Sequence, residues 1–308
     1  MFPIFLPYYN KTIPPTLFVD RVGDFVVIFK KTILYLMFVN TSNHFFEREV
    51  RIMLKYEIVN NQKQDWVVFV HGIAGSTLTW KKQVDDFSKQ YNLLLLDLPG
   101  HGKNADNIIK KVDINKLNNG IKDTLDHVGI KKAHFIGMSL GTIVIASFAT
   151  TYPQYIKSIV FGGAALALSG IYNGCVRFVN NAKKILPYKG MYKFFAWFMM
   201  PRKNHAKSRK IFLREAVKLN KKTMLAWIEY LTLALHPKAL IEKMAKLKLK
   251  VMFISGDEDH CFIGGTKNIL KNLKTAKCHI IKHCGHICTI ERAKEFNEYA
   301  LEYIGAVA

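Results

Sequence analysis

The 308-residue chain has few acidic residues and few arginines. It carries 45 lysines and arginines against 23 aspartates and glutamates, a formal net charge of +22, and only 8 of the 45 are arginines. A general bias toward lysine would explain this charge without any function. Residues 177–250, however, hold 19 of the basic residues and only 3 of the acidic ones. This concentration favours an anionic substrate or membrane surface, whereas nucleic acid is disfavoured because no binding module is recognisable.

Cysteines and long apolar runs are also scarce. Five cysteines do not form the even framework of a disulfide-rich secreted protein, so we expect a reducing, cytoplasmic environment. The apolar run at residues 25–39 spans 15 residues and carries Lys30 and Lys31 at its centre, which is short and costly for a bilayer span, so packing or peripheral contact is favoured over a true span. Met1 is followed directly by the apolar residues FPIFLP, without the basic stretch that begins a signal peptide, so a cleaved signal peptide is not expected.

The first 46 residues stand outside the pattern of the rest of the chain. We expect residues 1–46 to form an apolar N-terminal extension, either an interfacial helix or a flap packed on the body, with peripheral membrane contact as one outcome.

Sequence motifs for cofactors are absent as well. The chain has neither a G-x-x-x-x-G-K-[ST] loop nor a G-x-G-x-x-G fingerprint, so no nucleotide cofactor is expected. Cys284 and Cys288 lack the second pair of ligands that a structural zinc site requires. We therefore expect no cofactor and no metal.

Short apolar runs alternate with amphipathic stretches from Trp66 onward. Strands are expected within residues 55–60, 66–72, 92–100, 133–139, 156–164, 250–259 and 278–286, and helices within 80–90, 114–128, 142–150 and 265–273. This alternation predicts an α/β fold with a mostly parallel central sheet flanked by helices. The alternation breaks at about residues 165–248, which we interpret as a helical cap inserted into a domain of residues 47–308.

Ser139 lies between Gly137 and Gly141, after an expected strand and before an expected helix. A serine there is either a nucleophile or an ordinary turn residue, and nucleophilic attack requires a base and an oxyanion site. Candidate partners follow other strands. Asp257, Glu258 and Asp259 come after one strand, and His283 and His286 come after the next.

Five motifs in this order resemble those of the α/β-hydrolase superfamily. They are HG-x-x-G at residues 71–75, D-x-PGHG at 97–102, G-x-S-x-G at 137–141, G-x-x-D at 256–259, and GH at 285–286. The resemblance covers about residues 55–304 and implies the α/β-hydrolase fold.

The resemblance also implies roles for individual residues. Ser139 would be the nucleophile, His286 the general base, and Asp259 the carboxylate that orients His286. The backbone N–H groups of Ile73 and Leu140 would form the oxyanion hole. The G-x-x-D and GH spacings of the family favour Asp259 over Asp257 and His286 over His283.

A serine with a histidine base supports acyl transfer through an acyl-enzyme. We expect a serine hydrolase that cleaves small or lipid-like carboxylic esters. An acyltransferase, a thioesterase or a carbon–carbon bond hydrolase would use the same triad, and a non-catalytic protein would use the same fold to bind a ligand. The aromatic, methionine-rich stretch at residues 191–203 is equally consistent with an ordinary cap helix and with an acyl wall or lipid-facing surface.

Overall fold

The computed structural model describes residues 18–22, 25–30, 33–39, 45–48, 53–169, 188–234 and 238–307, the first four ranges by backbone alone. Contacts divide the chain into two units, Met1–Ile52 and Met53–Ala308. The sequence analysis places that boundary at residue 46. Each unit is described by itself.

The first unit contains an antiparallel sheet of four strands in the order β1-β2-β3-β4. These are β1 (Phe18–Val22), β2 (Phe25–Lys30), β3 (Ile33–Val39) and β4 (Phe45–Arg48). The apolar run at residues 25–39 thus forms two paired strands, from Phe25↔Phe38 to Lys30↔Ile33. The alternative of an interfacial helix is wrong, because the run is rich in Val, Ile, Phe and Tyr, which favour extended backbone.

The second unit is built on a seven-stranded sheet in the order β11-β10-β9-β8-β6-β7-β5. The strands are β5 (Lys55–Val59), β6 (Trp66–Val70), β7 (Asn92–Asp97), β8 (Ala133–Met138), β9 (Ile156–Gly162), β10 (Val251–Gly256) and β11 (Lys277–Ile281). Only β5 runs antiparallel to its neighbour. The predicted fold class is confirmed, and each expected strand forms.

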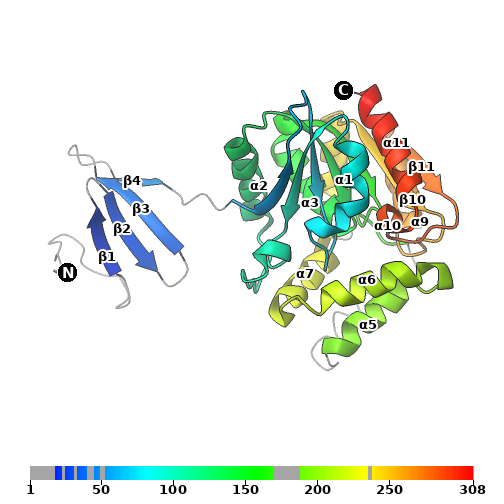
Figure 1. The fold of residues 1–308 in the computed structure, drawn as a ribbon, viewed down its shortest axis with the longest axis horizontal. Coiled ribbons are helices and arrows are strands. Elements are labelled where there is room, and N and C mark those ends of the chain that lie inside the picture. Colours follow the sequence, from blue (N-terminus) through cyan, green and yellow to red (C-terminus); the bar gives the residue numbers. More distant parts are fainter. Residues whose placement is uncertain are drawn as a thin grey trace. The chain divides into compact units, whose positions relative to one another are not determined.

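Helices cover both faces of this sheet (Figure 1). One face carries α1 (Lys81–Phe87), α10 (Cys288–Glu291) and α11 (Ala293–Ala306); the other carries α2 (Ile114–Val128), α3 (Leu140–Thr151), α8 (Lys238–Lys246) and α9 (Ile263–Asn272). Two separate apolar clusters fill the spaces between helices and sheet. Because most strands are covered on both sides, their residues are apolar without alternation.

The ends of α2 show how local sequence sets a helix. The Asp113 carboxylate accepts hydrogen bonds from the backbone N–H groups of Asn115 and Lys116 at the start of the helix. The helix ends at Gly129, whose φ of 84° lies in the left-handed region that glycine adopts without strain.

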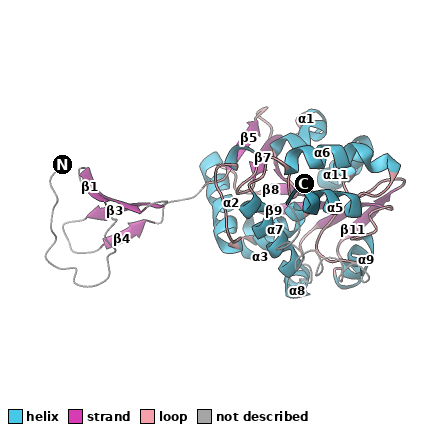
Figure 2. Cartoon of the chain, turned by 90° about the horizontal axis from the view of Figure 1, so that it is seen from below, coloured by secondary structure: helices cyan, strands magenta, loops and turns pink. Residues whose placement is uncertain are grey.

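Helices occupy the described part of the chain between β9 and β10. They are α5 (Tyr188–Met199), the short 3₁₀ turn η5 (Lys203–His205), α6 (Ala206–Ala216), α7 (Lys221–Ala234) and α8. Figures 1 and 2 show α5, α6 and α7 together at one end of the sheet, whereas α8 packs against α3 and α9. We call α5, η5, α6 and α7 the cap helices. Three further 3₁₀ turns are η1 (Thr77–Trp80), η2 (Gly102–Asn104) and η3 (Pro153–Tyr155).

Among the described residues, none of the helices is both long and apolar enough to cross a bilayer.

Candidate active site

Ser139 occupies a sharp turn between the end of β8 and the first residue of α3. Its φ of 52° and ψ of −118° are strained for a residue with a side chain. This conformation lifts the hydroxyl above the carboxyl edge of the sheet, where ligands of open α/β sheets bind.

Close backbone approach explains why glycines flank this serine. A Cβ at Gly141 would overlap the carbonyl oxygen of Val70 in β6, and a Cβ at Gly137 would lie 2.9 Å from the backbone of Gly141. The turn can therefore form only where both side chains are hydrogen.

The structure brings Ser139, His286 and Asp259 together from three turns far apart in the sequence. His286 Nε2 lies 2.9 Å from Ser139 Oγ, and His286 Nδ1 lies 2.9 Å from Asp259 Oδ2. Both the imidazole and the carboxylate are buried. An imidazole held in this way can take a proton from the serine hydroxyl while the carboxylate fixes its tautomer.

The competing acids and the competing histidine have other contacts. Asp257 accepts a hydrogen bond from the backbone N–H of Cys284, and Glu258 forms an ion pair with Arg202 of the cap segment. His283 is exposed and lies 4.0 Å from Glu258. The geometry thus brings Asp259 and His286, rather than Asp257 and His283, to Ser139.

The proposed oxyanion donors are Ile73, in the loop after β6 that lines the cavity, and Leu140, which directly follows Ser139 as the first residue of α3. Ile73 and Leu140 are buried, and no described residue accepts a hydrogen bond from the backbone N–H of either. Unpaired buried N–H groups are unusual in proteins. Two of them next to an activated hydroxyl could stabilise the negative charge of a tetrahedral intermediate.

Two buried histidines hold the Ile73 loop in place. The backbone N–H of Leu98 donates to His71 Nε2, and in return the N–H of Ala74 donates to His101 Nε2, both at 3.1 Å. His71 follows β6 and His101 follows β7, so each imidazole accepts a bond from the other's loop. We call this pair the histidine brace.

Both histidines of the brace are neutral. Burial lowers the pKa of His71, and burial together with the neighbouring His71 lowers the pKa of His101 to about 3. A neutral ring can accept at Nε2 while its Nδ1–H donates to a carbonyl, to Gly72 for His71 and to Pro99 for His101. The D-x-PGHG pattern favours a structural, loop-ordering role for His101 over a catalytic one, and its bond to Ala74 agrees with that interpretation.

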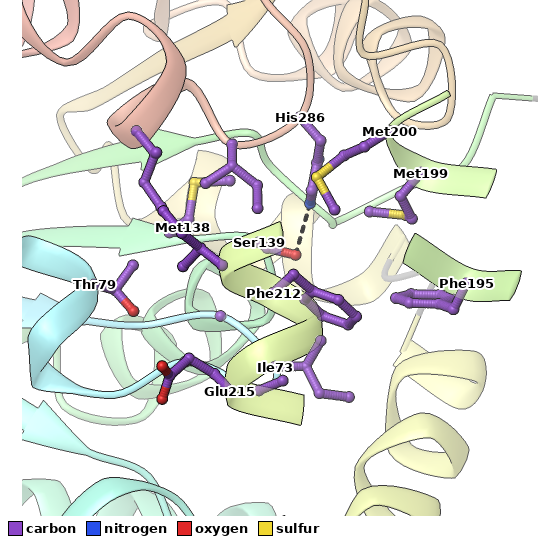
Figure 3. A pocket seen from close by; sticks show the side chains of 16 residues that line it. Ile73, Thr79, Met138, Ser139, Phe195, Met199, Met200, Phe212, Glu215 and His286 are labelled. Carbon is purple, nitrogen blue, oxygen red and sulfur yellow. Dashed lines mark hydrogen bonds between the residues drawn. The ribbon is translucent and has the colours of Figure 1, made fainter. Parts of the chain in front are cut away.

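A cavity that is partly open to solvent lies over Ser139 (Figure 3). Its wall is mainly apolar. Phe195 and Met199 come from α5, Met200 directly follows that helix, and Ile211 and Phe212 come from α6. Apart from the titratable His286, one charged residue, Glu215, is found among the described residues that line the cavity. Glu215 forms ion pairs with Arg214 and Lys218.

Comparison with known proteins agrees with this architecture. A family model described as the alpha/beta hydrolase fold matches residues 65–170, which include β6, the Ser139 turn and β9. The chain has the α/β-hydrolase fold.

Several relatives of this α/β-hydrolase carry named activities. A 2-hydroxy-6-oxononadienedioate/2-hydroxy-6-oxononatrienedioate hydrolase of Paraburkholderia phymatum is 26% identical over 264 residues, covering 79% of this chain and 88% of the relative.

Solved structures share the α/β-hydrolase fold with this chain. A carboxylesterase structure from Nitrososphaera gargenis superposes with a TM-score of 0.70 at 16% identity, covering 91% of this chain and 98% of that one. The enol-lactonase of Burkholderia xenovorans LB400 superposes with a TM-score of 0.68 at 20% identity, covering 82% and 96%. The comparisons together support a hydrolase and leave open which bond it cleaves.

Thr142 of this α/β-hydrolase fixes the Ser139 turn from behind. Its hydroxyl donates to the Ser139 carbonyl at 2.6 Å and accepts from the backbone N–H of Ala165 at 3.1 Å. The sequence analysis gave Thr142 no role, because its partner Ala165 follows a different strand.

Glu258 ties the cap to the turn that carries Asp259. Its carboxylate accepts hydrogen bonds from Arg202 at 2.5 Å, Asn204 at 2.7 Å and His205 at 2.8 Å. Burial by itself would raise the pKa of Glu258, but these donors outweigh it and lower the pKa to about 2. We call Glu258 and its three partners the cap latch.

The cysteines near His286 are buried thiols. Burial raises the pKa of both Cys284 and Cys288 above the ordinary range. Neutral thiols are poor metal ligands. No group of three or more metal-ligating side chains is found within the described ranges.

Proposed function

We propose that this α/β-hydrolase is a serine hydrolase that cleaves carboxylic esters with an uncharged, apolar acyl group. The observation that carries the proposal is the hydrogen-bonded chain Ser139–His286–Asp259 beneath an apolar cavity. The catalytic roles of these residues are part of the proposal.

The geometry supports a two-step mechanism. Ser139 Oγ attacks the ester carbonyl as His286 Nε2 takes its proton, and the N–H groups of Ile73 and Leu140 stabilise the oxyanion. The intermediate collapses to an acyl-enzyme as His286 returns the proton to the leaving alcohol. Water, deprotonated by His286, then releases the acid.

The cavity wall supports an apolar acyl group. When a hydrocarbon chain contacts phenylalanine, methionine and isoleucine side chains instead of water, the free energy of binding becomes more favourable. The change is roughly 0.8 kcal/mol for each methylene group buried. We therefore expect kcat/KM to rise with acyl-chain length until the cavity is filled.

Carbon–carbon bond cleavage is the second candidate, because relatives such as the Paraburkholderia phymatum protein are named for it. Their named substrates are dicarboxylates, whose charges call for cationic groups in the pocket. Among the described residues that line this cavity, none is a lysine or arginine, and Glu215 would repel an anion. This difference favours the neutral ester.

The test is a series of p-nitrophenyl esters from acetate to decanoate, with a 2-hydroxy-6-oxo-dienedioate assayed beside it. We expect turnover that increases with chain length, labelling by a fluorophosphonate probe, and a loss of roughly a thousandfold or more in Ser139→Ala. Faster turnover of the dienedioate would establish the second candidate instead. Absence of both turnover and labelling would leave a ligand-binding protein, and acyl transfer to an added alcohol in preference to water would identify an acyltransferase.

A further inference from the structure

The outer face of α5 presents aromatic side chains to solvent. Phe194 is 47% exposed and Trp197 is 54% exposed, with the exposed Lys193 beside them. The inner face of the same helix carries Phe195 and Met199 toward the cavity. Large half-exposed rings on one helix face are typical of an interaction surface.

Helix α6 packs against α5, and the outer face of α6 is cationic. Lys207 and Lys210 are exposed and form no ion pair within the described ranges. Residues 188–220 contain nine lysines and arginines, and their single acidic residue, Glu215, is already paired. The charges of Lys207 and Lys210 therefore have no carboxylate partner among the described residues.

A second observation points to an anionic ligand at the same face. Lys207 of α6 lies close enough to Lys82 of α1 for their charges to interact, and Lys82 donates to the carbonyl oxygen of Ile290. Burial, and then the charge of Lys207, lower the pKa of Lys82. Neither lysine has an ion pair among the described residues, and two neighbouring cations of this kind create a positive potential that an anion would relieve.

We propose that Lys193, Phe194, Trp197, Lys207 and Lys210, which we call the α5–α6 surface, dock on an anionic phospholipid membrane. The rings would enter the interfacial region, and the ammonium groups would contact lipid phosphates. A second copy of the chain fits less well, because it would bring the same uncompensated cations together. An RNA fits less well, because the rings lie on an outward helix face and not in a groove that follows a strand.

Docking would link the membrane to the cavity. Both α5 and α6 carry cavity residues on their inner faces, so a membrane on their outer faces would lie one helix away from the proposed acyl site. Membrane binding itself does not depend on hydrolysis. The docking proposal can therefore be wrong while the proposed esterase function is right, and the esterase function can be wrong while the docking proposal is right.

The experiment is co-sedimentation of the full chain with vesicles of phosphatidylcholine, with and without phosphatidylserine. We expect binding only to the anionic vesicles, equal in the wild type and in Ser139→Ala. Lys207→Glu/Lys210→Glu should lower the partition coefficient by roughly tenfold or more. Phe194→Ala should lower it severalfold, with hydrolysis of soluble esters unchanged in both variants.

Matched controls separate the surface from overall charge. Lys243→Glu/Lys246→Glu changes two exposed lysines at the same spacing on α8, and Ile108→Ala removes a residue that is 51% exposed elsewhere. Both should bind as the wild type does. Equal loss in control and test variants, equal binding to neutral vesicles, or no binding would overturn the proposal. The proposal would also be overturned if the chain formed a dimer that Phe194→Ala converts to monomer. Tighter binding of an RNA oligonucleotide than of vesicles, lost in Lys207→Glu/Lys210→Glu, would overturn it as well.

Discussion

Neighbouring residues hold Ser139 in a backbone conformation that its own side chain disfavours. Gly137 and Gly141 allow α3 to approach β8 and β6 closely, and Thr142 bonds to the Ser139 carbonyl. The histidine brace has the corresponding role for the Ile73 loop, where Ala74 also has a positive φ of 58° and donates to His101. The proposed reactive atoms are thus positioned by residues such as Thr142 and His101, which are not among the described residues that line the cavity.

The brace gives a prediction for His101→Phe. Phenylalanine keeps the ring next to Trp227 but cannot accept the bond from Ala74, so a buried N–H is left unpaired and the Ile73 loop should shift. We expect kcat on p-nitrophenyl esters to fall roughly tenfold or more with little change in KM.

His134→Phe is the matched control, because His134 is equally buried but bonds to Ser158 away from the loop. It should lower the melting temperature without lowering kcat. An unchanged kcat in His101→Phe, or the same kcat loss in both variants, would show that the brace does not position the oxyanion site.

At the scale of elements, the turns after β10 and β11 have two tasks. The first turn carries Asp259 toward His286 and Glu258 toward the cap; the second carries His286 and Gly285, where a Cβ would lie 2.6 Å from the ring of His205. Cap position and triad geometry therefore depend on the same short segments.

Glu258→Gln should loosen the cap without unfolding the sheet. The amide keeps the size of the side chain but loses the charge that Arg202 and His205 contact. We expect faster hydrogen exchange at residues 200–206 and a severalfold higher KM for long-chain esters. Asp257→Asn, whose partner Cys284 is outside the cap, should leave exchange in that segment unchanged.

For the whole molecule, buried neutral histidines set the response to acid. The pKa of His101 is lowered to about 3 and that of His134 to about 4, chiefly by burial, from an ordinary 6.5. Between these values and 6.5 the unfolded chain binds protons that the folded chain does not. Stability is therefore complete above pH 6.5 and decreases below it, and the lowered pKa of Glu258 adds a further loss below about pH 4.5.

Urea unfolding between pH 7 and pH 4 measures this effect. Each buried histidine should contribute a slope of about 1.4 kcal/mol per pH unit to the free energy of unfolding within its window. His134→Phe should flatten the curve by that amount. A wild-type free energy that stays constant from pH 7 to pH 5 would contradict the assignment of neutral imidazoles.

The sequence by itself predicted the seven strands of the larger sheet, the helices α1, α2, α3 and α9, and the candidate triad, because these depend on local periodicity and on motifs at strand ends. Ser139, Asp259 and His286 could be named since each directly follows a buried apolar run. The run at residues 25–39 was harder: its length and composition disfavoured a bilayer span but did not decide between an interfacial helix and a flap, and the two paired strands became visible only in the structure.

Only the tertiary structure decided which residues support these groups. The partners of the histidine brace lie 27 positions apart, and those of the cap latch lie more than 50 positions apart. Such pairs leave no periodic trace, because a hydrogen bond between loops requires only that two chain segments meet. The outer face of α5 likewise became distinct from its inner face only when packing buried one side and left the other in water.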